Sequence, residues 1–531
     1  MLPSYSNESK DRIKKINDLK AAGVIPYANH FHWKQDIDYI RKQEDKIKDV
    51  KELMENGAVG EFKTAWRMML TRSMWKLIFA TIQDHTWKIQ ICFMKDKAKF
   101  NTWRKLVDSL LIDGEEKSAH KIAEKYILAG DYVGVIWDLF LTKHGELTIF
   151  VKEFQILSKA VRPLPEKFHW VTDQETLYRQ RYLDMTMNEE TYNRFLLRSK
   201  FLKVIREFYD KHGFIEIETP VLWNAASGAA AQPFVTHHND FDLDVYLRIA
   251  PEVNLKKATV GRFERVFEIS RNFRNEGSDP SHMQEFTAIE HYAAWWNYED
   301  NMKFTEEMFD YIFEKLNLPK KMMIKDKDGN EKEIDWSTPW ERIDYIKWVK
   351  EKSWIDIEKY TMEDEEKLRE DIKKAGYTWE WIEKQWVTTM IDYLYKKVLR
   401  PSIVWPAFVY NYPATMQPLA RHSDENENIV EQFQVVVNGW EIIKAYSELV
   451  DPIEQKKKFD EQSSALERWD EEATSGDDEF VLAMEYGMPP QSGWGMWIER
   501  ILALLTGQDN LRDVFMFPLM KPENGEEKKE K

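Results

Sequence analysis

The chain has 531 residues with 43% hydrophobic side chains, and its 76 basic and 92 acidic residues give a formal net charge of −16. This composition excludes intrinsic disorder over most of the chain and predicts two to four folded domains. One cysteine, Cys92, excludes a disulfide framework and a cysteine-rich zinc site, and the lack of an apolar run of about 18 residues predicts a cytoplasmic protein that spans no membrane.

Residues 1–57 are polar and helix-prone, and we expect an N-terminal helical extension there. A solvated helix face is the commoner role for its basic residues, and contact with an RNA backbone is the alternative. These residues cluster near the start of the chain; they are Lys10, Arg12, Lys14, Lys15 and Lys20.

Residues 58–160 alternate between short apolar segments and polar connections, which predicts an OB-fold β-barrel with a helix near 118–128. Such barrels commonly bind single-stranded nucleic acid by stacking bases on aromatic rings. Phe79 and Phe93 are candidates, although packing in the core is the commoner role of any one ring. The five expected strands are 62–70, 76–82, 88–94, 132–140 and 147–154.

Residues 172–522 predict a larger α+β domain after a linker with Pro163 and Pro165. It begins with an amphipathic helix at 190–211 and a strand that ends at Pro220, and a hairpin and helical insertion is expected at about 320–400. The charged residues 523–531 predict a disordered tail.

Two segments of this domain carry patterns suited to anionic substrates. In the segment 263–274, alternation along a strand places Glu268, Ser270, Asn272 and Arg274 on one face. The planar Arg274 guanidinium can hold a carboxylate or phosphate. The segment Gly-Trp-Gly-Met-Trp-Ile-Glu-Arg at 493–500 predicts a strand that leads into a helix. Taken singly, the two segments also suit surface ion pairs and a tight strand–helix junction.

Together with the segment 214–234, these patterns resemble motifs 1, 2 and 3 of the class II lysyl-tRNA synthetases of bacterial type. The sequence Phe-Arg-Asn-Glu-Gly at 273–277 is characteristic of motif 2, and Ala-Tyr-Ser-Glu-Leu at 445–449 is similar to the lysine subgroup. The resemblance implies an α+β multidomain fold, with an OB-fold anticodon-binding domain and a class II antiparallel β-sheet flanked by helices. It also implies a homodimer formed through motif 1.

The resemblance implies ATP-dependent activation of L-lysine to lysyl-adenylate and transfer to the 3′ end of tRNA(Lys). Arg274 would hold the lysine carboxylate and the α-phosphate, and Arg500 would cover the base or the γ-phosphate. The lysine pocket implied is Gly228, Glu252, Arg274, Glu290, Tyr292 and Glu448. The ATP contacts implied are Arg274, Glu276, His282, Phe286, Glu441 and Arg500, and the anticodon-reading positions are Phe79, Gln90 and Glu146.

Glu441 would coordinate Mg²⁺ that bridges ATP oxygens, since hard cations prefer carboxylate oxygens. Two departures from the family bear on this region. Gln434 stands where a second metal-binding glutamate is usual, which leaves the number of Mg²⁺ ions open. Lys444 stands where an asparagine near the substrate is usual, and a cation there is unfavourable beside a lysine pocket unless it points away.

Tryptophan outnumbers glycine in this chain, 22 to 20, although glycine averages roughly 7% of residues. Trp75 and Trp87 stand in strand connections that commonly need positive φ, and an indole at Trp497 would block ATP. We hypothesise that UGA codons were read as tryptophan where the source reads glycine. Seven tryptophans occupy glycine positions of the resembling family: Trp66, Trp75, Trp87, Trp137, Trp170, Trp405 and Trp497.

Further candidates for this misreading are Trp33, Trp381, Trp386 and Trp469, whereas Trp340, Trp440 and Trp494 are ordinary aromatic positions. The alternative is that all 22 tryptophans are genuine and that the chain is an aromatic-rich or degenerate paralogue.

Other functions stay open beside lysine–tRNA ligation. An aspartate- or asparagine-type class IIb synthetase shares the layout, but an anionic substrate side chain would require arginine where Glu448 stands. A non-catalytic RNA-binding relative is supported by Trp497, Gln434 and Ser281. It is disfavoured because the expected ATP-site residues are all present: Arg274, Glu276, His282, Glu441 and Arg500. A lysine ligase that modifies a protein is disfavoured by the expected anticodon-reading barrel.

Overall fold

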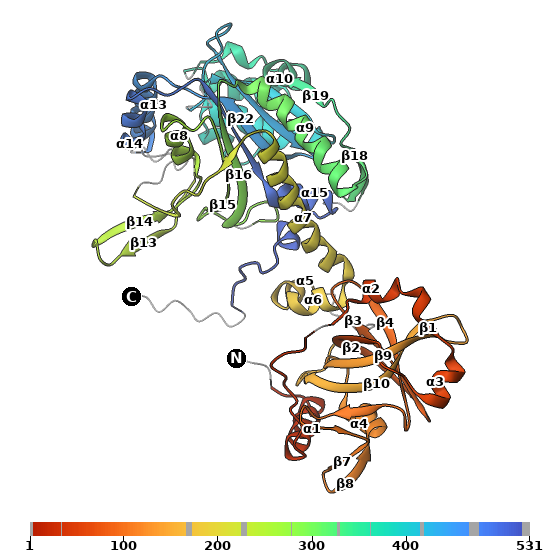
Figure 1. The fold of residues 1–531 in the computed structure, drawn as a ribbon. Helices are drawn as coiled ribbons and strands as arrows, with labels where there is room; N and C mark the ends of the chain where they lie inside the picture. Colours follow the sequence, from red (N-terminus) through yellow and green to blue (C-terminus); the bar gives the residue numbers. More distant parts are fainter. Residues whose placement is uncertain are drawn as a thin grey trace. The chain divides into compact units, whose positions relative to one another are not determined.

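The computed structural model forms two compact units, Met1–Thr172 and Asp173–Lys531 (Figure 1). It describes residues 4–32, 34–165, 173–224, 231–277, 279–325, 330–361, 363–414, 419–466 and 477–522. Trp33, Trp170, Gly228, Trp469 and the tail 523–531 therefore lie outside the described residues. Within the described ranges, no helix combines the length and apolar character needed to cross a bilayer.

A closed barrel of five strands forms the centre of the first unit. The strand order is β9-β2-β3-β4-β10, and the barrel closes because β9 pairs with both β2 and β10. This barrel is consistent with an OB-fold. Each strand overlaps a segment predicted from the sequence; the strands are β2 (Phe62–Met74), β3 (Leu77–Gln83), β4 (Lys88–Met94), β9 (Tyr132–Leu141) and β10 (Leu147–Ser158).

The elements around the barrel agree with the sequence only in part. The predicted helix is α4 (Ala119–Tyr126), which starts where the Ser118 side chain accepts a hydrogen bond from the Lys121 N–H. The segment before residue 58 contains α1 (Asn7–Ala21), α2 (Ile37–Arg41), η1 (Glu44–Lys46) and α3 (Val50–Asn56). Sequence reasoning missed five short strands: β1 (Ile47–Lys48), β5 (Lys99–Asn101), β6 (Leu106–Val107), β7 (Ser109–Ile112) and β8 (Glu115–Ser118).

The barrel interior is filled by the inward side chains of its strands. Phe93 is 1% exposed and packs edge-on against Phe154 with ring centroids 5.2 Å apart. Core packing, the commoner role expected for such a ring, is therefore confirmed for Phe93, and Phe93 is not a candidate for base stacking. Phe79 is half-buried on the alternate face of β3, beside Leu53 of α3 and Cys92.

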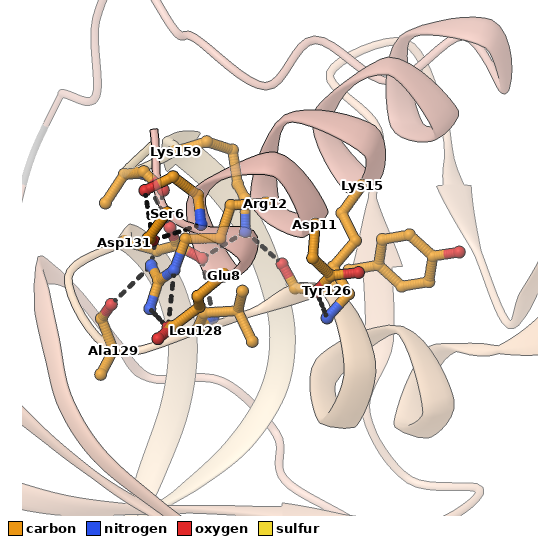
Figure 2. A network of polar contacts seen from close by, with 12 residues as sticks. Ser6, Glu8, Asp11, Arg12, Lys15, Tyr126, Leu128, Ala129, Asp131 and Lys159 are labelled. Carbon is orange, nitrogen blue, oxygen red and sulfur yellow. Dashed lines mark hydrogen bonds and ion pairs between the residues drawn. The ribbon is translucent and has the colours of Figure 1, made fainter. Parts of the chain in front are cut away.

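Arg12 of α1 fastens this helix to the barrel, as Figure 2 shows. Its Nη1 donates to the Ala129 carbonyl at 2.9 Å, and its Nη2 lies 3.0 Å from Glu8 Oε1. Nearby, Lys159 pairs with Asp131, whose carboxylate also accepts the Leu128 N–H at 2.7 Å (Figure 2). Arg12 is 3% exposed, so it serves the fold and does not contribute to a solvated basic face.

Replacing Arg12 with alanine should lower the free energy of local unfolding of α1 by about 2 kcal/mol, since the charge-assisted hydrogen bonds to Ala129 and Glu8 are lost. Amide hydrogen exchange across Asn7–Ala21 measures this change. Lys14→Ala is the control, because Lys14 forms an exposed ion pair with Asp113 and should change the same quantity by less than about 1 kcal/mol. Equal effects of the two substitutions would contradict the assignment.

An eight-stranded sheet forms the centre of the second unit, in the order β11-β15-β16-β23-β22-β21-β20-β19. The six central strands pair antiparallel, and the outer pairs β11–β15 and β19–β20 are parallel. The strands are β11 (Ile215–Glu216), β15 (Arg265–Phe273), β16 (Glu285–Ala294), β19 (Glu341–Asp344), β20 (Ala407–Pro413), β21 (Ile429–Val437), β22 (Trp440–Ser447) and β23 (Gln491–Trp497).

Helices α7 (Glu189–Lys211) and α9 (Tyr298–Leu316) pack side by side on one face of this sheet (Figure 1). Phe208 of α7 and Phe304 of α9 meet with ring centroids 5.0 Å apart. Phe304 also contacts His291 of β16, and the buried Trp494 of β23 donates from Nε1 to Thr305. Helix α7 agrees with the helix predicted at 190–211 to within one residue.

Several other elements surround the sheet. The strand predicted to end at Pro220 is shorter than expected, because β11 ends at Glu216. The predicted hairpin is formed by β17 (Lys321–Lys325) and β18 (Glu331–Asp335), and most of its turn lies outside the described residues. A second, smaller sheet contains β12 (Leu222–Trp223), β13 (Val235–His238) and β14 (Leu243–Leu247).

The helices of the second unit include a cluster at 345–402 that follows β19. That cluster comprises α10 (Tyr345–Ser353), η2 (Ile357–Lys359), α11 (Glu365–Lys374), η3 (Ile382–Lys384), α12 (Val387–Tyr393), η4 (Leu394–Leu399) and η5 (Arg400–Ser402). The others are α5 (Gln174–Arg179), α6 (Arg181–Met187), α8 (Glu252–Val260), α13 (Pro452–Leu466), α14 (Asp478–Glu485), α15 (Ile498–Leu505) and η7 (Leu511–Val514).

Candidate active site

The sheet face opposite α7 and α9 carries two rows of polar side chains. His291 and Trp494 bond to α9, so their neighbours in each strand point to the other face. On that other face, strand pairing places residues of β16, β23, β22 and β21 side by side in rows that cross the sheet. One row is Glu290, Gly495, Lys444 and Gln434, and the next is Tyr292, Gly493, Tyr446 and Gln432.

Gly493 makes room for an acidic pocket on this face. A Cβ built at residue 493 would lie 2.3 Å from Glu448 Oε1 and 2.5 Å from Tyr292 Cε1. Such contacts are far inside van der Waals distance, so any larger residue would displace both side chains. The glycine therefore lets Glu448 and Tyr292 approach the middle of the sheet.

The acidic pocket lies between helix α8 and the sheet. Glu252, the first residue of α8, accepts hydrogen bonds from Lys256 Nζ at 2.6 Å and from Tyr446 Oη at 2.7 Å. Lys256 Nζ also lies 2.5 Å from Glu448 Oε2. Lys256 and Glu448 are each 2% exposed, so the structure brings two carboxylates and one ammonium together away from solvent.

Charge in this pocket is unbalanced. Burial lowers the pKa of Lys256, but Glu252 and Glu448 together outweigh burial and raise it, so the ammonium stays charged. One ammonium cannot neutralise two carboxylates, and burial raises the pKa of Glu448 to about 8. Burial likewise raises the pKa of Glu290 to about 8, with Glu252 adding to the shift. The pocket therefore favours binding of additional positive charge.

Arg274 lies beside this pocket, directly after β15. Its backbone N–H donates to the Gln284 carbonyl at 2.8 Å, and its half-buried guanidinium lies 5.1 Å from the centroid of Phe286. Burial lowers the pKa of Arg274, and Glu290 is the strongest of the carboxylates that oppose this shift. A permanently charged, forked donor at the edge of an acidic pocket is suited to an anionic group carried by a cationic ligand.

A second cluster of predicted residues lies next to Arg274. Arg500, near the start of α15, donates from Nη1 to the Glu441 carbonyl at 2.6 Å, and its Nη2 is 3.2 Å from His282 Nε2. His282 Nδ1 lies 2.8 Å from Asp279 Oδ2. Burial lowers the pKa of Arg500 to about 10. The buried Phe286 ring stacks on Trp497 of β23, which places an aromatic surface beside both arginines.

The residues expected to bind metal are only partly brought together. Glu441 is half-buried and follows the start of β22. Gln434 is 7% exposed, and its Oε1 accepts the Tyr412 hydroxyl at 2.8 Å. Among the described residues, the one group of three whose His, Cys, Asp or Glu ligand atoms lie within 4.8 Å of one another is Asp36, Asp84 and His85, in the barrel unit. In the part of the second unit that the structure describes, Glu441 therefore belongs to no such group of three.

Three other predicted positions have distinct outcomes. Lys444 Nζ lies 5.8 Å from the Tyr446 ring. Burial lowers the pKa of Lys444 although Glu441 and Glu252 oppose the shift, which weakens the unfavourable effect of a cation beside a lysine pocket. Glu276 is exposed, and its backbone carbonyl accepts a hydrogen bond from Gln284. Gly228 lies outside the described residues.

Sequence reasoning missed Lys256 and Tyr446 as pocket residues. Lys256 is four residues after Glu252, and this spacing places both side chains on one face of a helix. Tyr446 is two residues before Glu448, and both reach the pocket from the end of β22. Helical spacing and strand alternation were the signals that could have identified them.

In the barrel unit, two of the three predicted anticodon-reading residues, Gln90 and Glu146, are hydrogen-bonded to each other. Gln90 of β4 donates from Nε2 to Glu146 Oε2 at 2.8 Å and accepts the Thr148 hydroxyl at 2.9 Å. Phe79 of β3 faces outward on the same side as Gln90, since Thr81 pairs with Gln90 and lies two residues from Phe79. The three side chains therefore share the outer face of the barrel.

Residues 173–521 match the family model for class II tRNA synthetases (D, K and N). The chain is 43% identical over 459 residues to the lysine–tRNA ligase of Aquifex aeolicus (strain VF5), covering 86% of this chain and 73% of that protein. It is 40% identical over 533 residues to the lysine–tRNA ligase of Thermosipho africanus (strain TCF52B), covering 98% and 97% of the two chains. The chain belongs to the class II lysine–tRNA ligase family.

Proposed function

We propose that the chain is a lysine–tRNA ligase that converts L-lysine and ATP to lysyl-adenylate and pyrophosphate. A terminal ribose hydroxyl at the 3′ end of tRNA(Lys) then takes the lysyl group, and AMP leaves. The observation that carries this proposal is the charge imbalance of the pocket. The Lys256 ammonium pairs with both Glu252 and Glu448, and the charge of Glu252 also adds to the raised pKa of Glu290. Substrate lysine brings two ammonium groups for these carboxylates and one carboxylate for Arg274.

In the first step, an oxygen of the lysine carboxylate attacks the α-phosphorus of ATP, and the bond to pyrophosphate breaks. The carboxylate is already ionised near neutral pH, so the reaction requires positioning and charge neutralisation rather than a general base. Arg274 holds the carboxylate and the α-phosphate together. Arg500 and His282, 3.2 Å apart, hold the base and the outer phosphates, with Glu276 and Phe286 contacting adenine.

Mg²⁺ is the metal that we propose for this reaction. Its preference for oxygen ligands and bound water suits a site with a single protein carboxylate, Glu441, completed by ATP phosphate oxygens. Gln434 is less suited to a second metal, because its amide oxygen already accepts the Tyr412 hydroxyl. The metal would neutralise charge on the triphosphate as pyrophosphate leaves.

The wider assignment follows the same proposal. The region 58–160 would bind the anticodon of tRNA(Lys), residues 172–522 would carry out catalysis, and the segment 214–234 would form a homodimer interface. Gly228 would contact the lysine α-amine, and we place the enzyme in the cytoplasm. An aspartate- or asparagine-type activity is disfavoured by Glu448, and the non-catalytic alternative by the retained cluster of Arg274, His282 and Arg500.

ATP–pyrophosphate exchange with individual amino acids tests the proposal. The protein for this assay has glycine in place of the seven tryptophans that occupy glycine positions of the family, which are Trp66, Trp75, Trp87, Trp137, Trp170, Trp405 and Trp497. Lysine-dependent exchange is expected. Exchange with aspartate or asparagine would support the class IIb alternative, and lack of exchange with any amino acid would support a non-catalytic relative.

Gln90→Ala should spare lysine-dependent exchange and lower tRNA(Lys) aminoacylation about 10- to 100-fold in kcat/KM. The expected loss corresponds to about 1–3 kcal/mol, the usual contribution of one stacking or base-edge contact. Glu115→Gln is the control, since Glu115 is exposed on β8, in a two-stranded sheet with β7 that is separate from the barrel strands. Unchanged aminoacylation by the Gln90 variant would contradict the anticodon assignment.

A further inference from the structure

Strand β23 presents an unusual series of residues to the active site. Strand alternation gives this face Gly493, Gly495 and Trp497, so two positions without side chains precede an indole. Phe286 stacks on that indole with ring centroids 4.2 Å apart and an interplanar angle of 20°. The Arg500 guanidinium lies 3.9 Å from the same indole. Since a stacked ring and a guanidinium cannot share one face at these distances, they cover both faces of Trp497.

We infer that the indole of Trp497 fills the slot for the adenine base of ATP, and that glycine is the residue of the working enzyme at position 497. This inference rests on the proposed function. Indole and adenine are both flat, fused two-ring systems, and both stack on phenylalanine and arginine planes. Because the indole is tethered, its effective concentration in the slot far exceeds that of a ligand in solution.

The backbone supplies an independent observation. Twelve non-glycine residues of the described chain have positive φ, and five of them are tryptophan, although the sequence has 22 tryptophans among 531 residues. The other seven are three aspartates, three asparagines and one arginine. Aspartate and asparagine tolerate this conformation, whereas a bulky side chain rarely adopts it. The five tryptophans are Trp75, Trp103, Trp295, Trp354 and Trp381.

Solvent exposure also indicates that glycine suits four of these five positions better than tryptophan. Trp75, Trp295, Trp354 and Trp381 expose 88%, 68%, 89% and 62% of their surface. Trp354 also occupies the C-terminal cap of α10 with φ of 64°, a position where glycine is the usual residue. A large exposed indole in a left-handed conformation contributes little packing, so glycine is the residue that these positions favour.

The two kinds of observation agree only in part with the positions expected from the sequence. Positive φ is confirmed at Trp75, and Trp381, a further candidate for the misreading, also has positive φ. Three cases, Trp103, Trp295 and Trp354, were missed. The positive φ expected at Trp87 is wrong, because Trp87 is not among the left-handed residues and its N–H donates to Asp84 Oδ1 in an ordinary turn.

Trp137 has a different signature. It is fully buried and stacks on Phe62, and its Nε1 has no hydrogen-bond partner in the described part of the chain. Trp340 and Trp494 are buried with Nε1 bonded, as expected for ordinary tryptophans.

Isothermal titration with ATP tests the inference on the full chain as written, on Trp497→Gly and on Trp354→Gly. Trp497→Gly should bind ATP at least 100-fold more tightly than the other two chains. Equal affinity of Trp497→Gly and the chain as written, or no binding by either, would overturn the inference. Trp354→Gly should raise the melting temperature without changing ATP affinity, since Trp354 lies outside the site.

Two further measurements complete the test. Reading the codons is independent of folding: UGA at positions 497, 75 and 354 supports the inference, and UGG overturns it. The ATP titration and the lysine-dependent exchange assay are also independent, because ATP can bind without activation of lysine. Tight ATP binding by Trp497→Gly without lysine-dependent exchange would therefore contradict the proposed function and leave the base-slot inference intact.

Discussion

Arg274→Ala should reduce lysine-dependent ATP–pyrophosphate exchange at least about 1,000-fold in a chain that carries glycine at position 497. Removing a preorganised donor from a transition-state site commonly costs this much. Arg274 is also the cation that most strongly favours the charged form of Glu290, so its loss leaves this half-buried carboxylate with the weaker support of Arg248. Steady-state exchange measured against lysine and ATP concentration gives the loss in kcat/KM.

Two variants make the Arg274 measurement specific. Arg274→Lys should recover only part of the rate, since an ammonium keeps the charge but cannot hold a carboxylate and a phosphate with one planar fork. Arg271→Ala should retain most activity, because Arg271 is exposed and lies 3.5 Å from Glu285. If Arg271→Ala and Arg274→Ala lose activity equally, the site assignment is wrong.

The five strands of the barrel were predictable because their signals are local, whereas most strands of the second unit were not assigned from the sequence. In the barrel, the alternation of apolar residues predicts the strands Leu77–Gln83 and Lys88–Met94 even when the strands that pair with them are unknown. The two-residue strand β1 was not predictable, since it exists only through parallel pairing with the distant β9, and β11 was predicted but too long, because its pairing with β15 covers only Ile215 and Glu216. Pairing of this kind leaves almost no pattern in the sequence.

The candidate site was predictable where motifs lie on regular elements. Arg274, His282, Phe286 and Arg500 converge because one hairpin and one strand–helix junction carry them. The role of Arg12 could not be read from composition, since burial against Ala129 separates it from the exposed lysines nearby. The position of Lys256 between Glu252 and Glu448 likewise required tertiary contacts.

The pKa of Glu448, raised to about 8 by burial, predicts how lysine binding depends on pH. Below that value the carboxyl group holds a proton, which must leave when the substrate ammonium binds. The KM for lysine should therefore fall as pH rises from about 6.5 to 8.5, by up to about tenfold per unit below the pKa. Glu448→Gln should reduce this slope without abolishing it, because the pKa of Glu290 lies in the same range.

Glu448→Gln should also lower kcat/KM for lysine about 100- to 1,000-fold, equivalent to about 3–4 kcal/mol, in the chain with glycine at 497. Glutamine keeps the shape of the side chain, but the single negative charge left at Glu252 is then neutralised by Lys256, and the substrate ammonium finds no free anion there. Glu479→Gln is the matched control, since Glu479 is exposed and pairs with Lys257 at 3.5 Å. Full activity of Glu448→Gln would mean that this pocket does not select lysine by charge. A lower kcat/KM for lysine with unchanged ATP affinity would assign the selection of lysine to Glu448.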